Sequence, residues 1–275
     1  MPLIVVFTLF AWWPILQGLL LSFQKTNFIS SSWVGLANFE RVLSDPLLGQ
    51  AAFNTLVFML LSLVFGFPLP IFVATAIAEM RRARGVASAF AFIPVVMPPV
   101  VSILLWKFFY RPGEEGLFNS ILGLVGIGPL PWLQSPVLAM PSLVFVAIWA
   151  GFGFTTIIFL ASLMSIRTEL YEAAEVDGAS IARRFWHITL PHLRGTMLVI
   201  LLLQVIGTAQ VFTEPYLMTG GGPANATTTL LLMVFRYAFQ FGDYGAATAL
   251  SLMLALALAG FAALYAVATR KWSTR

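Results

Sequence analysis

The sequence predicts an all-α polytopic membrane protein with six transmembrane helices, and two observations support this. Of the 275 residues, 60% are hydrophobic and 9% are charged, with a mean hydropathy of +0.92. A soluble domain has about 25% charged residues. The charges are also grouped, which leaves six long uncharged runs. Because about 20 apolar helical residues cross a hydrocarbon core of about 30 Å, each run can supply a span.

The first run, Pro2 to Phe23, is expected to be a retained span. The alternative is a cleaved secretory signal, but the Met-Pro-Leu start has no basic n-region, and no small-x-small cleavage site follows Phe23. The basic segment that often precedes a first span is missing, which leaves open whether the chain is complete at its start. A polar segment, Gln24 to Gln50, follows and includes the turn-like stretch SSSWVGLANFERVLSDP.

The second and third spans are expected at about Ala51 to Ala78 and about Val86 to Phe109. Glycine and proline within the spans indicate kinked, closely packed helices, and ordinary packing explains most of them. They are Pro14, Pro68, Pro70, Pro94, Pro98, Pro99, Gly151 and Gly153. The stretch IPVVMPPV differs, because three prolines in six residues break the hydrogen-bond ladder. A broken helix is tolerated only against protein or a water-filled cavity, so this stretch indicates a pathway.

The remaining spans are expected at about Leu138 to Ser165, Gly195 to Thr213 and Tyr244 to Thr269. The uncharged run from Gly116 to Ile166 is long enough for two spans. Its glycines and prolines favour one membrane helix preceded by an irregular or interfacial piece. A glycine-rich loop joins the fifth and sixth spans.

Lysine and arginine are unevenly shared between alternate loops. One side holds ten: Arg81, Arg82, Arg84, Arg167, Arg183, Arg184, Arg194, Arg270, Lys271 and Arg275. The other side holds five: Lys25, Arg41, Lys107, Arg111 and Arg236. Because cytoplasmic loops have the excess of basic residues, both termini and the loop between helices four and five are expected in the cytoplasm. This asymmetry explains the net charge of +4 better than nucleic-acid binding does.

The loop at 166–194 is the most charged part of the chain. Its acidic residues suit the start of a helix, and Gly178 allows a turn that a side chain would hinder. Ile181, Phe185 and Ile188 then recur at i, i+4 and i+7 and form one apolar stripe. Pro191 is expected to mark a boundary before the next span. The pattern predicts two short helices outside the bilayer, which rest on lipid headgroups or fit a groove on a cytoplasmic protein.

The stretch EAAEVDGASIARRFWHITLP resembles the cytoplasmic EAA loop of permease subunits of ABC importers. That pattern is Glu-Ala-Ala, three residues, Gly, nine residues, then Ile-x-Leu-Pro. It is matched by Glu172, Ala173, Ala174, Gly178, Ile188, Leu190 and Pro191. The resemblance covers nearly the whole chain and points to the carbohydrate-uptake branch. There the similar stretches are WVGLANFERVLSDP, NTLVF, MTGGGPANATTTLL and FGDYGAATALSLML.

The resemblance implies the ABC importer permease fold, with one transmembrane permease domain over 1–275 and a coupling loop at 166–194. A coupling helix between helices four and five is then expected in a cleft of an ATPase subunit. The implied coupling residues are Glu172, Ala173, Ala174, Asp177, Gly178, Ile181, Phe185, Ile188, Leu190 and Pro191. Glu172 is expected to make polar contacts, the alanines to permit close approach, and Gly178 to permit the turn.

The implied partners are a second permease subunit, two ATPase subunits, an extracytoplasmic substrate-binding protein and membrane lipid, in a bacterial plasma (inner) membrane. The second permease is expected to be a different chain, although a homodimer stays open. None of the three lysines follows a glycine, so there is no phosphate-binding loop. ATP and Mg are therefore expected on the partner ATPase, and this chain is expected to be no enzyme and to bind no cofactor.

Polar residues within spans are pathway candidates. The best set is in and beyond the fifth helix: Gln204, Thr208, Gln210, Glu214 and Tyr216. Hydrogen bonding between helices explains such residues equally well. Asn54, Thr55 and Asn119 are weaker candidates. A flexible outer loop that could reach a docked binding protein is expected at Gly220, Gly221, Gly222 and Pro223, although a simple connector is equally plausible.

Two rival functions are weaker. An intramembrane hydrolase needs a base within the bilayer, but His187 and His192 lie in the charged loop. A secondary transporter or channel is expected to have charged residues within its spans, which contain essentially none. The chain has no cysteine, which excludes disulfides and thiolate metal sites, and no metal site or catalytic residue is expected. The sugar itself is not determined by the sequence.

Overall fold

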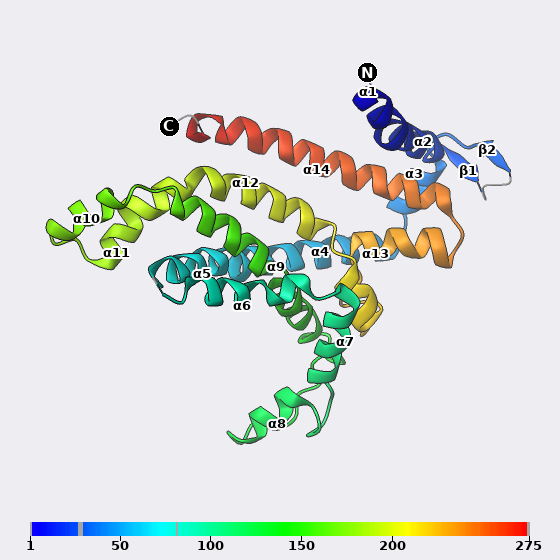
Figure 1. The fold of residues 1–275 in the computed structure, drawn as a ribbon. Coiled ribbons are helices and arrows are strands. Elements are labelled where there is room, and N and C mark those ends of the chain that lie inside the picture. The colour runs from blue at the N-terminus through cyan, green and yellow to red at the C-terminus, as the bar shows by residue number, and fades with distance from the viewer. Residues whose placement is uncertain (1, 27–29, 81, 274–275) are drawn as a thin grey trace.

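The computed structural model describes residues 2–26, 30–80 and 82–273, which form a helical protein with one short hairpin (Figure 1). The first span is one helix in three continuous parts: α1 (Pro2–Phe7), the π-helical segment η1 (Thr8–Trp12) and α2 (Trp13–Leu21). It contacts the last helix, yet no residue of Leu3–Leu21 is buried by the described part of the chain. The first span therefore lies at the edge of the helical bundle.

The polar segment after the first span is more ordered than its turn residues indicate. It contains β1 (Gln24–Thr26), β2 (Ser31–Trp33) and α3 (Ala37–Leu43), and the two strands pair antiparallel. Elements of three to seven residues are too short to show a hydrophobic period, so the sequence did not predict them.

The second span consists of α4 (Pro46–Leu61), the π-helical segment η2 (Ser62–Gly66) and α5 (Pro68–Glu79). It begins at Pro46 and not at Ala51 as predicted. Asp45 caps it, because the Asp45 side chain accepts a hydrogen bond from the Leu47 backbone N–H at 2.8 Å. Proline suits the first helical position, where its missing N–H has no partner to lose.

The third span is broken, as the prolines predict. α6 (Arg84–Val96) and α7 (Pro99–Phe109) meet at an angle of 94°. Met97 between them has an extended backbone, as expected for a residue before proline. The predicted break in the span from Val86 to Phe109 is therefore confirmed. After it, α7 turns away from the other spans, and the short α8 (Leu117–Gly123) follows (Figure 1).

The fourth span, α9 (Ala139–Met164), has the predicted extent. The charged loop then contains α10 (Thr168–Val176), after which one helix of 29 residues runs from Ile181 to Ala209. Its parts are α11 (Ile181–Arg184), the π-helical segment η3 (Phe185–Thr189) and α12 (Leu190–Ala209). The boundary expected at Pro191 is therefore wrong. The π-helical segment η3, which ends at Thr189, shifts the hydrogen-bond ladder, so the helix continues through Pro191 although proline has no N–H to donate.

The fifth span ends at Ala209, earlier than the predicted Thr213. The glycine-rich region beyond it contains three further elements, which the sequence did not predict: η4 (Pro215–Thr219), α13 (Leu230–Phe235) and η5 (Arg236–Gln240). The last span is α14 (Tyr244–Ser273). Within the described ranges, five helices are long and apolar enough to cross a membrane, and the bent α6–α7 pair would make a sixth.

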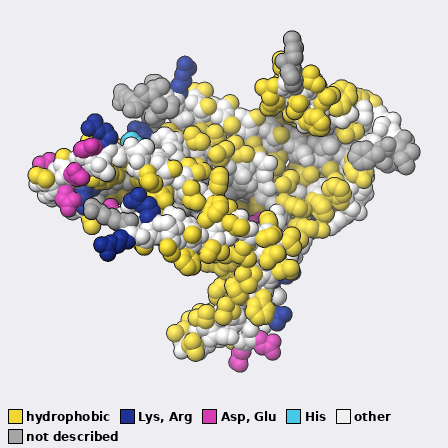
Figure 2. All heavy atoms as spheres, viewed as in Figure 1, with side chains coloured by type: hydrophobic (Ala, Val, Ile, Leu, Met, Phe, Trp, Pro, Cys, Tyr) yellow, Lys and Arg dark blue, Asp and Glu magenta, His cyan; other side chains and the backbone are white. Residues whose placement is uncertain are grey.

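The second, fifth and last spans run between two opposite ends of the molecule (Figure 1). The loop end consists of α10 and α11, and the hairpin end consists of β1, β2 and the helix α13–η5. Arg81 and Arg275, two of the residues in the predicted charge asymmetry, lie outside the described residues. In Figure 2, acidic and basic side chains gather at the loop end, and hydrophobic side chains cover most of the face between the ends.

Candidate functional site

The turn at Gly178 closes α10 with a Schellman motif. Gly178 has a φ of +75°, and the backbone N–H of Ala179 donates to the carbonyl of Ala174 at 2.8 Å. The N–H of Gly178 donates to the carbonyl of Glu175 at 3.0 Å. Ser180 then caps α11, because its hydroxyl accepts from the Arg183 N–H at 3.3 Å. The predicted turn is therefore a defined structure that requires a left-handed residue.

The apolar stripe of this loop is divided between two surroundings. Ile181 is 72% exposed, whereas the Phe185 ring stacks on Phe72 of the second span with centroids 6.0 Å apart. Ile188 packs against buried residues of the second, fourth and fifth spans. The three residues therefore do not form one exposed ridge. Phe185 and Ile188 hold the loop on the bundle, and Ile181 alone of the three faces outward.

Three exposed apolar residues of this loop, Leu170, Val176 and Trp186, were not predicted from the sequence, and Val176 is the most exposed. Val176 is 88% exposed beside the Gly178 turn. The sequence signal for Val176 is its position directly before Asp-Gly, at the end of a short helix that has no buried residue. Of the other predicted coupling residues, five are exposed and two are half-buried. The exposed ones are Glu172, Ala173, Asp177, Gly178 and Pro191, and the half-buried ones are Ala174 and Leu190.

A cavity of about 290 Å³ lies among the second, fourth and fifth spans. Gln204 and Thr208, two of the predicted pathway residues, line it from α12. The Gln204 Nε2 donates to the carbonyl oxygen of Ser62 at 2.8 Å, and the Thr208 hydroxyl donates to the carbonyl oxygen of Gln204 at 2.7 Å. The buried Ser62 hydroxyl, in π-helical η2, has no hydrogen-bond partner among the described residues. The cavity therefore has an apolar wall with a few polar groups, as small-molecule sites do.

The other three predicted pathway residues lie elsewhere. Gln210 lines a separate cavity between α12 and α14, and its Nε2 donates to the carbonyl oxygen of Ile206 at 3.2 Å. Glu214 is half-buried beyond the end of the span, and burial raises the pKa of its carboxyl group. Tyr216 stacks on Phe212 with centroids 5.1 Å apart. The structure thus brings only Gln204 and Thr208 together.

The glycine-rich loop is held by hydrogen bonds, which corrects the expectation of a flexible loop. The Arg236 Nη2 donates to the carbonyl of Gly220 at 2.8 Å, and the Thr228 hydroxyl donates to the carbonyl of Gly221 at 3.1 Å. The Thr227 hydroxyl donates to the carbonyl of Gly222 at 2.8 Å. Of the four predicted docking residues, Gly220 is exposed, Gly221 is buried, and Gly222 and Pro223 are half-buried.

Asn54 and Thr55, the weaker pathway candidates of the second span, hold this same loop. The Asn54 Nδ2 donates to the carbonyl oxygens of Asn225 at 2.8 Å and Thr228 at 2.9 Å, and the Thr55 hydroxyl accepts from the Leu230 N–H at 3.0 Å. Asn119 accepts from the Trp132 indole N–H at 2.9 Å within the α8 loop. All three therefore have structural partners.

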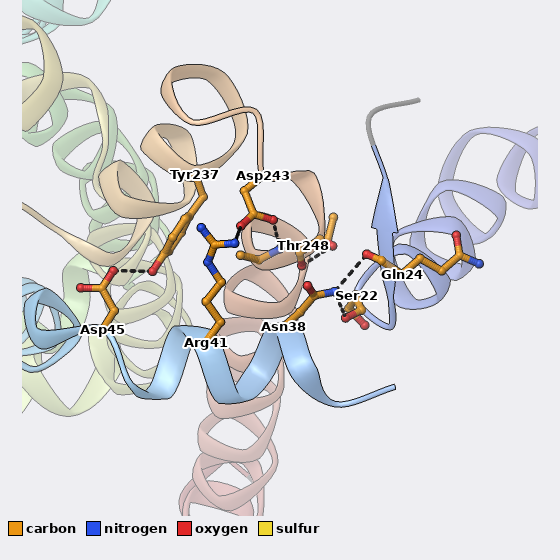
Figure 3. Close-up of polar contacts among 10 residues, drawn as sticks. Ser22, Gln24, Asn38, Arg41, Asp45, Tyr237, Asp243 and Thr248 are labelled. Atoms are coloured by element: carbon orange, nitrogen blue, oxygen red, sulfur yellow. Dashed lines mark hydrogen bonds and ion pairs between the residues drawn. The ribbon is translucent and has the colours of Figure 1, made fainter. Parts of the chain in front are cut away.

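A polar network joins three spans at the hairpin end (Figure 3). From α3, the buried Asn38 Nδ2 donates to the carbonyl oxygens of Ser22 at 2.8 Å and Gln24 at 3.0 Å. Arg41 on the same helix pairs with Asp243, which precedes α14, with Nη1 and Oδ2 2.7 Å apart. The network ties the end of the first span to the start of the last.

Tyr237 of η5 completes this network at the start of the second span (Figure 3). Its hydroxyl donates to the Asp45 carboxylate. Burial, and then the neighbouring Asp45, raise the pKa of the Tyr237 phenol, so that the group remains a donor even above the pH at which an ordinary tyrosine ionises.

Replacing Asn38 with leucine is expected to lower the stability of the hairpin end. Two carbonyl groups would lose a buried donor, and a buried unsatisfied polar group costs about 1–3 kcal/mol. The thermal midpoint of the purified protein in detergent should fall. Ser44→Ala is the matched control, because the Ser44 hydroxyl, directly after the same helix, makes an exposed hydrogen bond to the carbonyl of Glu40. Equal midpoints for the two variants would contradict the importance of this network.

Residues 66–273 match the family described as "Binding-protein-dependent transport system inner membrane component". The chain belongs to this family. It is 36% identical over 267 residues to the trehalose/maltose transport system permease protein MalF of Thermococcus litoralis, covering 96% of this chain and 90% of the relative. It is 29% identical to the arabinooligosaccharides permease AraP of Bacillus subtilis, covering 94% and 82%.

The fold of this family member matches solved transporter structures. One is a bacterial ABC transporter involved in the import of the acidic polysaccharide alginate, with a TM-score of 0.87, 28% identity, and coverage of 98% of this chain and 93% of that chain. Another is a bacterial alginate ABC transporter in complex with an alginate pentasaccharide-bound periplasmic protein, with a TM-score of 0.88, 27% identity, and coverage of 99% and 92%. The predicted fold, an ABC importer permease, is confirmed.

Proposed function

We propose that this permease forms half of the translocation pathway for a sugar or sugar derivative in an ATP-driven importer of a bacterial inner membrane. One observation supports this most strongly. The helix Ile181–Ala209 begins in the loop with the EAA motif and continues without a break to Gln204 and Thr208 in the cavity wall. A displacement of the loop is therefore a displacement of one wall of the cavity.

Two ATPase subunits would bind ATP and Mg and dock on the loop end, which faces the cytoplasm in this proposal together with both termini. Val176 and Ile181 offer exposed apolar contacts, and Glu172 offers a polar one. Closure of the ATPase dimer would push the loop, and rigid-body movement of the attached helices would change the side to which the cavity opens. A second permease, different from this chain, would supply the other half of the pathway.

A sugar is the proposed cargo because the named relatives are permeases of sugar transport systems and because polar residues that suit sugar hydroxyls line the cavity. Gln204, Thr208 and Ser62 line a largely apolar space. The similar alginate transporter forms a complex with a periplasmic protein, which supports an extracytoplasmic binding protein as a partner here. In this proposal the binding protein would deliver the sugar at the hairpin end, opposite the loop end (Figure 1).

Reconstituted transport tests this proposal. The complex should be purified through a tag on this chain and placed in liposomes with its binding protein, and radiolabelled maltose, trehalose and lactose should be offered as probes. We expect uptake of a sugar only when ATP and Mg are present on the side of the ATPase. Uptake that persists without ATP, or without any copurified ATPase, would instead indicate a secondary transporter or channel.

Replacing Thr208 with valine is expected to reduce uptake of the sugar about tenfold, the upper range for one lost hydrogen bond. Among the described residues, the Thr208 hydroxyl donates only to backbone carbonyls of its own helix. If Thr208 does not contact the sugar, its replacement should therefore reduce uptake very little. Thr269→Val is the matched control, because Thr269 makes the same bond to its own helix in α14. Equal uptake by both variants would remove Thr208 from the pathway.

A further inference from the structure

The coupling loop contains a cross-link that lies outside its sequence motif. The hydroxyl of Tyr171 in α10 and the hydroxyl of Thr189 in η3 share a hydrogen bond of 2.9 Å. Thr189 is 3% exposed, and the Tyr171 ring packs against a buried cluster that includes Leu163 and Leu193. A hydrogen bond sheltered from water in this way is harder to exchange for a bond to solvent than an exposed one.

The Tyr171–Thr189 bond connects α10 directly to the start of α12. Tyr171 directly precedes Glu172, and Thr189 directly precedes α12, whose far half lines the cavity. Along the backbone, the same two points are connected only through the tip of the loop and the Gly178 turn. The hydrogen bond therefore joins α10 to the moving helix at its base, where a small displacement of α10 is passed on directly.

A second cross-link in the loop is weaker. The Arg184 Nη1 lies 3.1 Å from the Glu175 Oε2, and the Glu175 side chain is 72% exposed. Exposed ion pairs contribute little to rigidity, because water and salt screen them. Of these two polar cross-links between α10 and the following helix, the Tyr171–Thr189 bond is therefore the stronger.

We propose that Tyr171 and Thr189 are positioning residues for energy coupling, which rests on the proposed function of the loop. Their hydrogen bond makes α10 and the helix Ile181–Ala209 move as one body. Without it, α10 rocks about the Gly178 turn and the segment before Thr168, so ATP is hydrolysed with less movement of the cavity wall. The bond contacts neither sugar nor nucleotide.

Three substitutions in the assembled complex test this proposal. Tyr171→Phe and Thr189→Val each remove one hydroxyl and keep the shape, whereas Thr189→Ser keeps the hydroxyl. We expect the first two to lower the amount of sugar imported per ATP hydrolysed by about three- to tenfold, the range that one hydrogen bond supports, and Thr189→Ser to restore most of it. The double variant should be no worse than either single variant, because both remove the same bond.

Tyr265→Phe is the matched control. It removes a phenolic hydroxyl that also donates between helices, to the carbonyl oxygen of Leu198 at 2.8 Å, but away from the coupling loop. The ratio of sugar to ATP should stay unchanged in this variant. A loss of complex yield and thermal stability in Tyr171→Phe, with an unchanged ratio, would mean that the bond is merely structural and would overturn the proposal.

A distance measurement tests the role of the Tyr171–Thr189 hydrogen bond independently of transport. Because the chain has no cysteine, spin labels can be placed at two introduced cysteines, Leu170→Cys on α10 and Val199→Cys on α12, both exposed positions. In lipid nanodiscs, the distribution of distances should be narrow in the parent chain and in Tyr265→Phe, and broader in Tyr171→Phe and Thr189→Val. Equal widths would overturn this inference even if import is confirmed, whereas absent ATP-driven import with a broadened distribution would overturn only the proposed function.

Discussion

Replacing Gly178 with valine is expected to abolish ATP-driven uptake while the chain still enters the membrane. Gly178 has a φ of +75°, and no described atom lies within 4 Å of the position that a Cβ would take, so the cost comes from the backbone alone. A left-handed conformation costs an ordinary L-residue about 1–2 kcal/mol, and a β-branched residue is a genuine outlier there. The Schellman bonds at 2.8 and 3.0 Å would open, and the angle between α10 and α11 would be lost.

Uptake per ATP hydrolysed in liposomes checks this expectation. Gly35→Val is the matched control, since Gly35 has a φ of +62° and the same open surroundings, but lies between β2 and α3, far along the chain from the loop at 166–194. Gly178→Asn should keep part of the activity, because asparagine tolerates the left-handed region. If Gly178→Val left both uptake and assembly of the subunits intact, the coupling role of this loop would have to be abandoned.

Replacing Gly153 with alanine is expected to prevent normal packing of the bundle. A Cβ at Gly153 would overlap the carbonyl oxygen of Ala91 and lie 3.1 Å from a methyl group of Val95. Backbone atoms cannot rotate away, so α6 and α9 would have to separate. Overpacking typically lowers the free energy of unfolding by about 1–3 kcal/mol and occasionally by more. Because the overlap here is with a backbone atom, we expect a loss at or above the upper end of this range. The loss should appear as low yield and a reduced thermal midpoint.

Gly260→Ala provides the comparison for this effect. Gly260 lies within α14, and no described atom approaches the position of its Cβ, so alanine should be neutral or slightly stabilising through its better helix propensity. Measuring the yield of folded protein and the thermal midpoint of both variants in the same detergent separates packing from propensity. Similar midpoints would contradict the close approach of α6 and α9.

The turn in the loop at 166–194 could be predicted because its signals are local. The spacing of the EAA motif and the glycine at its centre depend on neighbouring residues, and the positive φ of Gly178 agrees with them. The boundary at Pro191 was wrong for the same reason. Proline ends a regular helix, but the sequence does not show that η3 has already shifted the hydrogen-bond ladder.

The candidate pathway could be predicted only in part. Gln204 and Thr208 share one face of a helix, and this spacing placed them together correctly. The helix α12 ends at Ala209, so Gln210 is its C-cap residue. Its side chain lines another cavity, between α12 and α14. No local sequence pattern pointed to Ser62. Its carbonyl oxygen accepts a hydrogen bond from the Gln204 side chain, which lies 142 residues further along the chain.

The sequence by itself determined the membrane class, the approximate spans, the break at Pro98 and Pro99, and the loop through which energy is proposed to enter. Hydropathy and proline geometry act over a few residues and need no partner. Only the tertiary structure decided that the glycine-rich loop is held by Asn54 and Arg236, that Phe185 faces its own bundle, and that one helix joins the loop to the cavity. Those features depend on contacts between distant segments, which no local pattern encodes.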